Sequence, residues 1–171
     1  MSKILIAYAT AAGSTGDVAE AIAKTLRQAG VTVDAFRAKE VTDLSGYDAV
    51  VLGTGVRAGR IYAEAGQFLA TYQTALSRMP VASFVVCLSA RDGTDDDCAE
   101  AKGYLDAMFS QAPGVELVSK GAFAGVVDYT KLPWLLGLIL KGLKKEPGGD
   151  YRDWAAIEAW ASELPAILTA D

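Results

Sequence analysis

The amino-terminal segment is the part of this sequence that most constrains the fold. An apolar run, Ile4–Ala9, leads into a loop of small and hydroxyl-bearing residues, 10–15, and then into helical periodicity up to Ala29. The first amides of a helix have no partner inside the helix, and the helix dipole is positive there. Small residues let the backbone approach an anion, and hydroxyls add hydrogen-bond donors. The segment therefore predicts a strand, a phosphate-binding loop and a helix in succession.

The kind of phosphate is constrained by what this loop lacks. It has no Gly-Lys-Ser/Thr ending, which a nucleoside-triphosphate loop requires, and no lysine lies between Lys3 and Lys24. We expect nothing at this site to neutralise a triphosphate, so a single phosphate monoester is the better candidate. The candidate phosphate-binding residues are Thr10, Ala11, Ala12, Gly13, Ser14 and Thr15.

Length, charge and residue usage exclude several classes of function. With 171 residues we expect one domain, 1–171, with a sizeable core. A net charge of -5 argues against nucleic-acid binding, which needs a basic surface. The chain has no histidine, which removes Ser-His-Asp and Cys-His catalysis and His-based metal sites. The acidic residues at 92–97 lack calcium-loop spacing, so we expect no metal and interpret them as the first turn of a helix.

The sequence also carries expectations about location. No basic and then apolar leader precedes the first strand, and no apolar run reaches the roughly 20 residues that span a bilayer. We therefore expect a cytoplasmic protein, with peripheral contact at the inner face of the membrane as a further possibility. Cys87 lies in an apolar run and is expected to be a small buried hydrophobe.

Apolar runs and helical periodicities alternate along the whole chain. We predict strands at Ile4–Ala9, Val31–Phe36, Ala49–Leu52, Val81–Leu88 and Val115–Ala124, and helices at about 15–29, 63–76, 95–111 and from Asp153, with Pro165 kinking or ending the last helix. The second strand alternates as an edge strand does, whereas the third is uniformly apolar, as a strand covered on both faces is. Repeated βαβ units imply a parallel sheet with right-handed crossovers. The fold class is therefore α/β, a doubly wound five-stranded parallel sheet of order 2-1-3-4-5 with helices on both faces.

Three loops are expected to converge at one crevice. Residues 10–15, 53–60 and 89–94 follow the first, third and fourth strands, whose carboxyl ends flank the switch point of such a sheet. The additional candidate binding residues are Thr54, Gly55, Val56, Arg57, Ala58, Gly59, Ser89, Ala90 and Arg91. Alternatively these are ordinary turns, since any doubly wound fold needs Gly and Ser at strand ends.

A phosphate cradle beside two glycine- and serine-containing loops suits a flat ring with a phosphate tail. Flavin mononucleotide (FMN) is the natural candidate, and the glycines at 53, 55 and 59 would let the backbone approach the ring. Residues 53–58 also match the dinucleotide pattern G-x-G-x-x-A, but the helix begins several residues later, so we interpret this match as coincidental.

These motifs resemble the flavodoxin superfamily. Thr10, Gly13 and Thr15 match its phosphate motif, whereas Ala12 departs from it and removes one hydroxyl donor. The chain is more closely similar to one flavodoxin-like branch, the menaquinone-dependent protoporphyrinogen IX dehydrogenases of haem biosynthesis. The similar parts are residues 50–59 and 88–91, Gly148-Gly149, Asp153-Trp154 and an insertion at about 129–150. The resemblance implies a flavoprotein that uses FMN to pass electrons from protoporphyrinogen to a membrane quinone.

The insertion contains an apolar segment, 131–145, that ends in Lys141, Lys144 and Lys145. One interpretation is a helix that touches the membrane or covers the substrate, with the lysines reaching lipid phosphates or porphyrin propionates. The alternative is a helix packed on the sheet or in a dimer interface, so an oligomer is possible.

Charged and aromatic residues near the expected crevice allow two interpretations each. Arg57, Arg60 and Arg91 either hold anionic substrate groups and offset the charge of reduced flavin, or are solvated loop residues. Tyr62 ends the second loop and is the better candidate for stacking on the flavin, while Tyr8 lies inside the first strand and is expected in the core.

The preferred function is an FMN-dependent oxidoreductase that dehydrogenates a porphyrinogen, with quinone as acceptor. No side chain stands out as a catalytic base. The alternative is an electron carrier that docks to a redox partner protein. A third hypothesis is a flavodoxin-like module that has lost FMN, for which Ala12 is the only indication.

Overall fold

The computed structural model describes residues 2–11, 13–127 and 148–169. In chain order the elements are β1 (Lys3–Ala9), α1 (Ser14–Gln28), β2 (Thr32–Arg37), η1 (Ala38–Glu40), β3 (Ala49–Arg57), β4 (Arg60–Ile61), α2 (Ala63–Leu76), β5 (Val81–Cys87), η2 (Leu88–Ala90), α3 (Asp95–Phe109), β6 (Leu117–Ala124), β7 (Val126–Val127), β8 (Gly149–Asp150) and α5 (Trp154–Leu168).

Five strands form a parallel sheet in the order β2-β1-β3-β5-β6, with β4 added antiparallel to β3. Counting the five parallel strands in chain order, this is the predicted order 2-1-3-4-5. β2 lies at the edge, and β3 is buried from Ala49 to Gly55, as their sequence patterns predicted. The order reverses between β1 and β3, so their carboxyl ends flank the switch point of the sheet.

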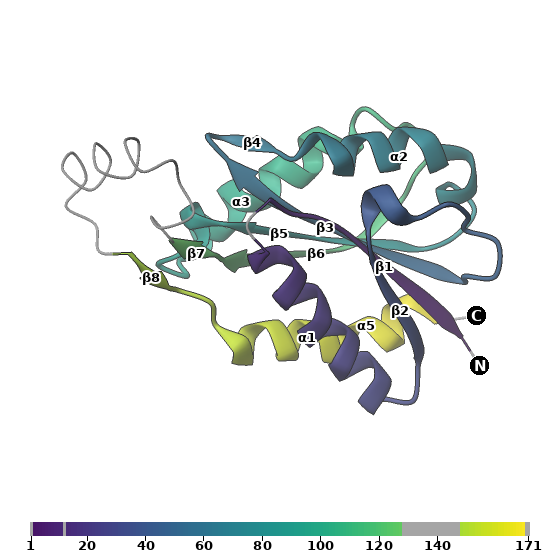
Figure 1. The fold of residues 1–171 in the computed structure, drawn as a ribbon, viewed down its shortest axis with the longest axis horizontal. Coiled ribbons are helices and arrows are strands. Elements are labelled where there is room, and N and C mark those ends of the chain that lie inside the picture. Colours follow the sequence, from purple (N-terminus) through teal and green to yellow (C-terminus); the bar gives the residue numbers. More distant parts are fainter. Residues whose placement is uncertain (1, 12, 128–147, 170–171) are drawn as a thin grey trace.

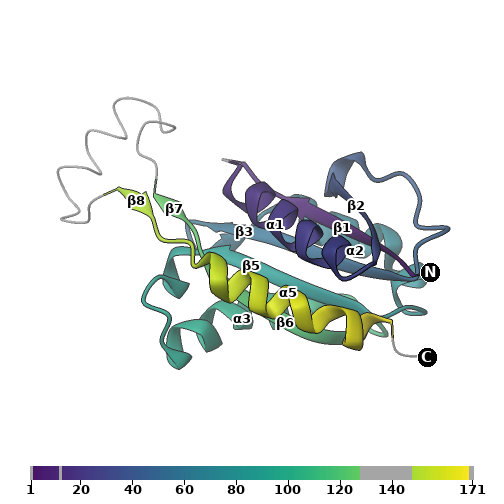
Figure 2. The ribbon, with the colours of Figure 1, turned by 90° about the horizontal axis from the view of Figure 1, so that it is seen from below.

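Helices cover both faces of the sheet, with α1 and α5 on one side and α2 and α3 on the other (Figures 1 and 2). Successive strand residues point to opposite faces, which explains why the central strands are apolar at nearly every position. Leu5 packs into the core shared with α2 and α3, whereas its neighbour Ile6 packs into the core shared with α1 and α5. Both side chains are fully buried.

The second core contains a cluster of three aromatic rings. The ring of Phe84 lies 6.3 Å from that of Phe123 and 6.1 Å from that of Trp160, centroid to centroid. The indole nitrogen of Trp160 donates to Ser119 Oγ at 3.1 Å, so the polar end of this ring has a partner. This cluster joins β5, β6 and α5.

The strand β3 is longer than the sequence predicted. It was expected to end at Leu52 and to be followed by a loop, but it continues to Arg57 and forms a hairpin with β4. The turn consists of Ala58 and Gly59, with φ angles of 51° and 73°. A two-residue turn with both φ angles positive matches the right-handed twist of the flanking strands.

The helix starts follow the expected capping chemistry. Asp153 caps α5 by accepting the amide of Ala156 at 3.0 Å, and Thr94 Oγ1 accepts the amide of Asp97 at 3.2 Å at the start of α3. The acids at 95–97 therefore lie in a first helical turn, as interpreted from the sequence. Of the two outcomes expected at Pro165, a kink or an end, the end is wrong, because α5 continues to Leu168, which is buried.

A short antiparallel ribbon precedes α5. Val126 pairs with Asp150 and Val127 pairs with Gly149, and the Tyr151 amide donates to the Gly125 carbonyl at 3.2 Å. This ribbon projects beyond the carboxyl ends of the parallel strands (Figure 2). Most of the insertion expected at 129–150, including the segment 131–145, lies outside the described residues. Of the helices in the described part, none is long and apolar enough to cross a membrane.

Candidate functional site

The loop between β1 and α1 is shaped by two local hydrogen bonds. Thr10 Oγ1 accepts the amide of Gly13 at 3.0 Å, and the Gly13 carbonyl accepts the amide of Asp17 at 3.1 Å. Gly13 has a φ of 95°, which favours glycine. In the described part of the chain, no side chain caps this helix start. Its first-turn amides are thus available to a ligand oxygen.

A pocket of about 120 Å³ lies beside this loop. It is lined by Thr10, Ser14, Thr15, Gly55, Val56, Tyr62, Val86, Cys87, Leu88, Gly125 and Val126. These residues come from the carboxyl ends of β1, β3, β5 and β6 and from the starts of α1, α2 and the ribbon. The structure thus brings the first two predicted loops together at the switch point.

Gly55 and Tyr62 define one wall of this crevice. A Cβ placed on Gly55 would lie 2.6 Å from Tyr62 Cε2 and 3.0 Å from Thr15 Oγ1. Only glycine therefore allows the tyrosine ring to lie against β3 at this point. Tyr8, by contrast, is half-buried and packs against the core of α1 and α5, as expected.

Not every predicted site residue lines the crevice. Thr54 is fully buried, and its hydroxyl donates to the Gly55 carbonyl at 3.0 Å. Ala90 is buried in the core, and Ser89 Oγ lies 3.2 Å from the Sγ of Cys87. Ala11 and Gly13 belong to the β1–α1 loop without lining the pocket, and Ala12 lies outside the described residues.

Three arginines of the predicted loops lie in the β3–β4 hairpin and at the end of η2. Arg57 and Arg60 are directly paired across the β3–β4 hairpin, and both are exposed. Like charges directly opposite each other on two strands are unfavourable unless an anion or solvent compensates them. Arg91 pairs with Asp92 at 3.2 Å, and its guanidinium lies 5.4 Å from the ring centre of Tyr151.

The sequence analysis missed several residues of this site. Val86, Cys87 and Leu88 end the fourth parallel strand, and Gly125 and Val126 follow the fifth, so the carboxyl-end rule alone would have included them. Cys87 is buried, as expected, although it also lines the pocket.

A basic side chain was also missed at the first loop. Arg37, at the end of β2, donates from Nη2 to the carbonyl of Thr10 at 2.8 Å. No local pattern predicts a cation at this loop, because 27 residues separate the two partners. Arg37 therefore adds a basic side chain at this loop, while the expectation that nothing at the site neutralises a triphosphate stays a prediction.

An arginine also ties the ribbon to α1. The guanidinium of Arg152 lies 2.6 Å from Asp150 and 2.8 Å from Asp17, and its own side chain is only 12% exposed. Hydrogen bonding to Asp150 raises the pKa of Arg152, and the same bond lowers the pKa of Asp150 below its ordinary value. The charged pair thus holds β8 against the helix that begins at the phosphate-binding loop.

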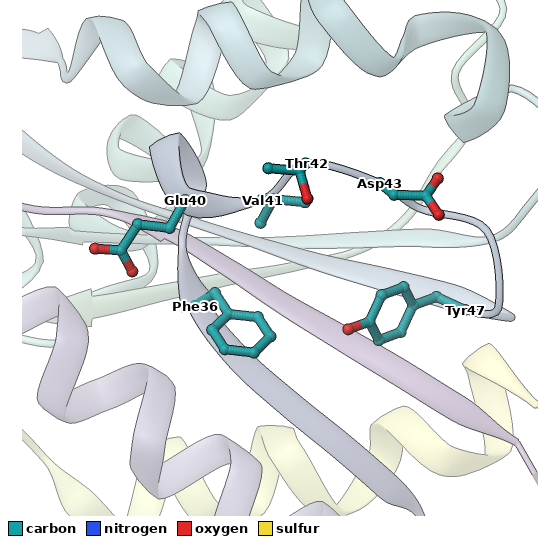
Figure 3. Close-up of a pocket in the computed structure, with 6 residues that line it drawn as sticks. All are labelled: Phe36, Glu40, Val41, Thr42, Asp43 and Tyr47. Atoms are coloured by element: carbon teal, nitrogen blue, oxygen red, sulfur yellow. The ribbon is translucent and has the colours of Figure 1, made fainter.

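A second pocket, of about 220 Å³, follows the edge strand and shares no residue with the crevice. It is lined by Phe36, Glu40, Val41, Thr42, Asp43 and Tyr47 (Figure 3). Burial and the neighbouring Asp34 carboxylate, which accepts the tyrosine hydroxyl at 2.8 Å, raise the pKa of Tyr47 to about 12. We assign the functional site to the crevice, where the helix amides and glycine-lined strand ends meet.

Comparison with known proteins agrees with this architecture. Two relatives are named protoporphyrinogen IX dehydrogenase [quinone]. The relative from Leishmania major is 29% identical, and the match covers 98% of this chain and 77% of the relative. The relative from Escherichia coli K12 is 27% identical, and the match covers 95% of this chain and 94% of the relative. A solved flavodoxin from the domain Archaea superposes with a TM-score of 0.63 at 12% identity, covering 98% of this chain and 99% of the other, which shows the shared fold. The flavodoxin domain model matches residues 5–153. The chain therefore belongs to the flavodoxin domain family.

Proposed function

We propose that this chain is an FMN-dependent oxidoreductase that dehydrogenates protoporphyrinogen IX with a quinone as electron acceptor. The observation that carries the proposal is the meeting of an uncapped helix start with glycine-lined strand ends at the switch-point crevice. The names of relatives that match nearly the whole chain support the choice of substrate and acceptor.

The residues of the crevice fit a flavin with a phosphate tail. The first-turn amides of α1 and the hydroxyls of Thr10, Ser14 and Thr15 would bind the phosphate. Gly55 would allow the ring edge to approach the backbone of β3, beside Tyr62. When bound, the flavin would supply the redox chemistry by accepting a hydride with its two electrons, while the chain supplies binding and orientation.

The rim of the crevice suits an apolar substrate that carries carboxylates. Leu88 lines the pocket and is 48% exposed, so it offers apolar surface at the opening. The paired guanidinium groups of Arg57 and Arg60, at the tip of the β3–β4 hairpin, would bind the propionates of a porphyrinogen. No described side chain is assigned as a base, and we propose that this chain acts chiefly by positioning its reactants.

The acceptor would be met at the membrane surface. The composition of residues 131–145, apolar with a lysine cluster, supports peripheral contact with lipid and with quinone. We therefore expect menaquinone in vesicles to support faster turnover than a water-soluble quinone analogue, and deletion of residues 131–145 to remove that difference while FMN stays bound.

The decisive experiment is anaerobic turnover of protoporphyrinogen IX by the FMN-loaded protein, with and without a menaquinone analogue, followed by porphyrin fluorescence. We expect porphyrin to form only when quinone is present. The variant Arg57→Gln/Arg60→Gln should raise KM with little change in bound FMN, and Gly66→Ala, on α2 away from the crevice, serves as the matched control.

Two results would overturn the proposal in different ways. Bound, reducible FMN without turnover would favour the alternative of an electron carrier for a redox partner protein. Failure of the intact chain to bind FMN would favour a flavodoxin-like module without cofactor.

A further inference from the structure

Arg37 is the described residue that most directly links the edge strand to the phosphate-binding loop. Its Nη2 donates to the carbonyl oxygen of Thr10 at 2.8 Å, a short distance for a bond from a charged donor. The strand register places Arg37 beside Tyr8, two residues before Thr10, at the carboxyl ends of both strands. The contact is therefore built into the pairing of β1 with β2.

Thr10 is held from two directions. Its carbonyl accepts from Arg37, and its hydroxyl accepts from the amide of Gly13. The first bond fixes where the loop leaves β1, and the second fixes how it turns into α1. Loss of either bond would loosen the amides that begin the helix.

Arg37 forms no ion pair with a carboxylate of the described residues. In residues 2–11, 13–127 and 148–169, the ion pairs that join arginines to carboxylates involve Arg27, Arg91 and Arg152 and leave Arg37 without one. Arg37 is half-buried, which reduces the screening of its charge by solvent. Its positive charge therefore acts at the loop in addition to the helix dipole.

We propose that Arg37 is a positioning residue that holds the Thr10 carbonyl and makes the crevice prefer a phosphorylated flavin to an unphosphorylated one. This inference rests on the proposed function, because it assumes that the loop binds the phosphate of FMN. It adds a source of phosphate selectivity that lies outside the loop itself.

Arg27 provides a comparison, because it is another arginine whose side chain donates to a backbone carbonyl, here between α1 and β2. It donates from Nε and Nη2 to the carbonyl of Val33 at 3.2 and 3.0 Å, so it too joins an arginine side chain to a backbone oxygen near β2. Arg27 lies in the last turn of α1, whereas the phosphate-binding loop precedes the first turn. Its removal should lower stability without changing the preference for phosphate.

The test compares FMN and riboflavin binding to the full chain and to Arg37→Met, Arg37→Lys and Arg27→Met, by quenching of flavin fluorescence at two salt concentrations. In Arg37→Met we expect FMN affinity to fall roughly tenfold, as for loss of one charge-assisted interaction, with riboflavin affinity nearly unchanged. Arg37→Lys should restore most of the loss, and the salt dependence of FMN binding should be weaker in Arg37→Met.

Unfolding curves of each variant show whether a loss of flavin affinity comes from a loss of folded-state stability. An equal loss of FMN and riboflavin affinity in Arg37→Met, or an unchanged ratio of the two, would overturn the inference. If Arg37→Met does not fold, two other measurements decide the question: the ratio of FMN to riboflavin affinity in Arg37→Lys, and the salt dependence of that ratio in the intact chain. A preference for FMN that does not change with salt would exclude a role for the charge of Arg37. If the intact chain does not bind FMN, the proposed function fails as well, which separates the two failures.

Discussion

The substitution Gly55→Ala tests the geometry of the crevice wall most sharply. The added Cβ would lie 2.6 Å from Tyr62 Cε2, 3.2 Å from Cδ2 of the same ring and 3.0 Å from Thr15 Oγ1. Carbon atoms pack at about 3.5–4.0 Å, so the ring must retreat by about 1 Å. Overpacking of this kind costs about 1–3 kcal/mol, which corresponds to a fall in Tm of roughly 2–12 °C in a chain of this length.

The assay is urea and thermal unfolding of four proteins: the wild type, Gly55→Ala, Tyr62→Ala and the double variant. Because the clash is mainly with the ring, Gly55→Ala should cost at least about 1 kcal/mol less in the Tyr62→Ala background, a coupling typical of residues in contact. Gly66→Ala is the control, since a Cβ at Gly66 meets nothing within 4 Å in a helix interior and should stabilise by about 0.5–1 kcal/mol.

Two results would refute the reasoning. An unchanged free energy of unfolding in Gly55→Ala would mean that the ring does not lie against β3. An equal loss in both backgrounds would mean that the cost comes from the backbone or from Thr15 and not from Tyr62.

Three further predictions follow from contacts outside that wall. Gly53→Ala places a Cβ 2.2 Å from the fully buried ring of Phe84, so the free energy of unfolding should fall by about 3 kcal/mol or more. Urea unfolding measures this loss, and a value below about 1 kcal/mol would contradict the packing of the ring against Gly53. The pKa of Tyr47 is raised to about 12 in the folded protein, against 10 when unfolded, so its contribution to the free energy of unfolding is complete below pH 10 and is lost as the pH rises toward 12. The variant Tyr47→Phe should therefore lose less stability than the wild type at alkaline pH. Identical profiles of unfolding free energy against pH in the two proteins would argue against the raised pKa. Arg152→Met should lose about 1 kcal/mol, and less in high salt, because Asp17 is exposed; a salt-independent loss would point to packing of the side chain stem.

The parallel sheet was predictable because its signal is local. Runs such as Val81–Cys87 are apolar at nearly every position, which is what burial on both faces requires. The edge position of β2 was predictable for the opposite reason, since Val31, Val33 and Ala35 alternate with polar residues in the sequence. The positions of the first two crevice loops then followed from the rule that places ligands at the carboxyl ends of the strands.

The parts that were missed depend on distant contacts or on unusual backbone. The β3–β4 hairpin turns at Ala58 with a positive φ, and alanine gives no sequence signal for that conformation. The helix α5 continues past Pro165 because Leu164 and Leu168 are both buried, so tertiary packing offsets the missing hydrogen bond. The bond from Arg37 to Thr10 arises only when β1 and β2 pair.

The β7–β8 ribbon has a consequence for how such a chain diversifies. Val127 and Gly149 are register partners, so the described parts of the chain on either side of residues 128–147 lie side by side, and Arg152 fastens this junction to α1. The entropy of closing a flexible connection grows slowly, by about 0.6 kcal/mol for each doubling of its length. A segment inserted at this junction can therefore change in length at little entropic cost to the sheet.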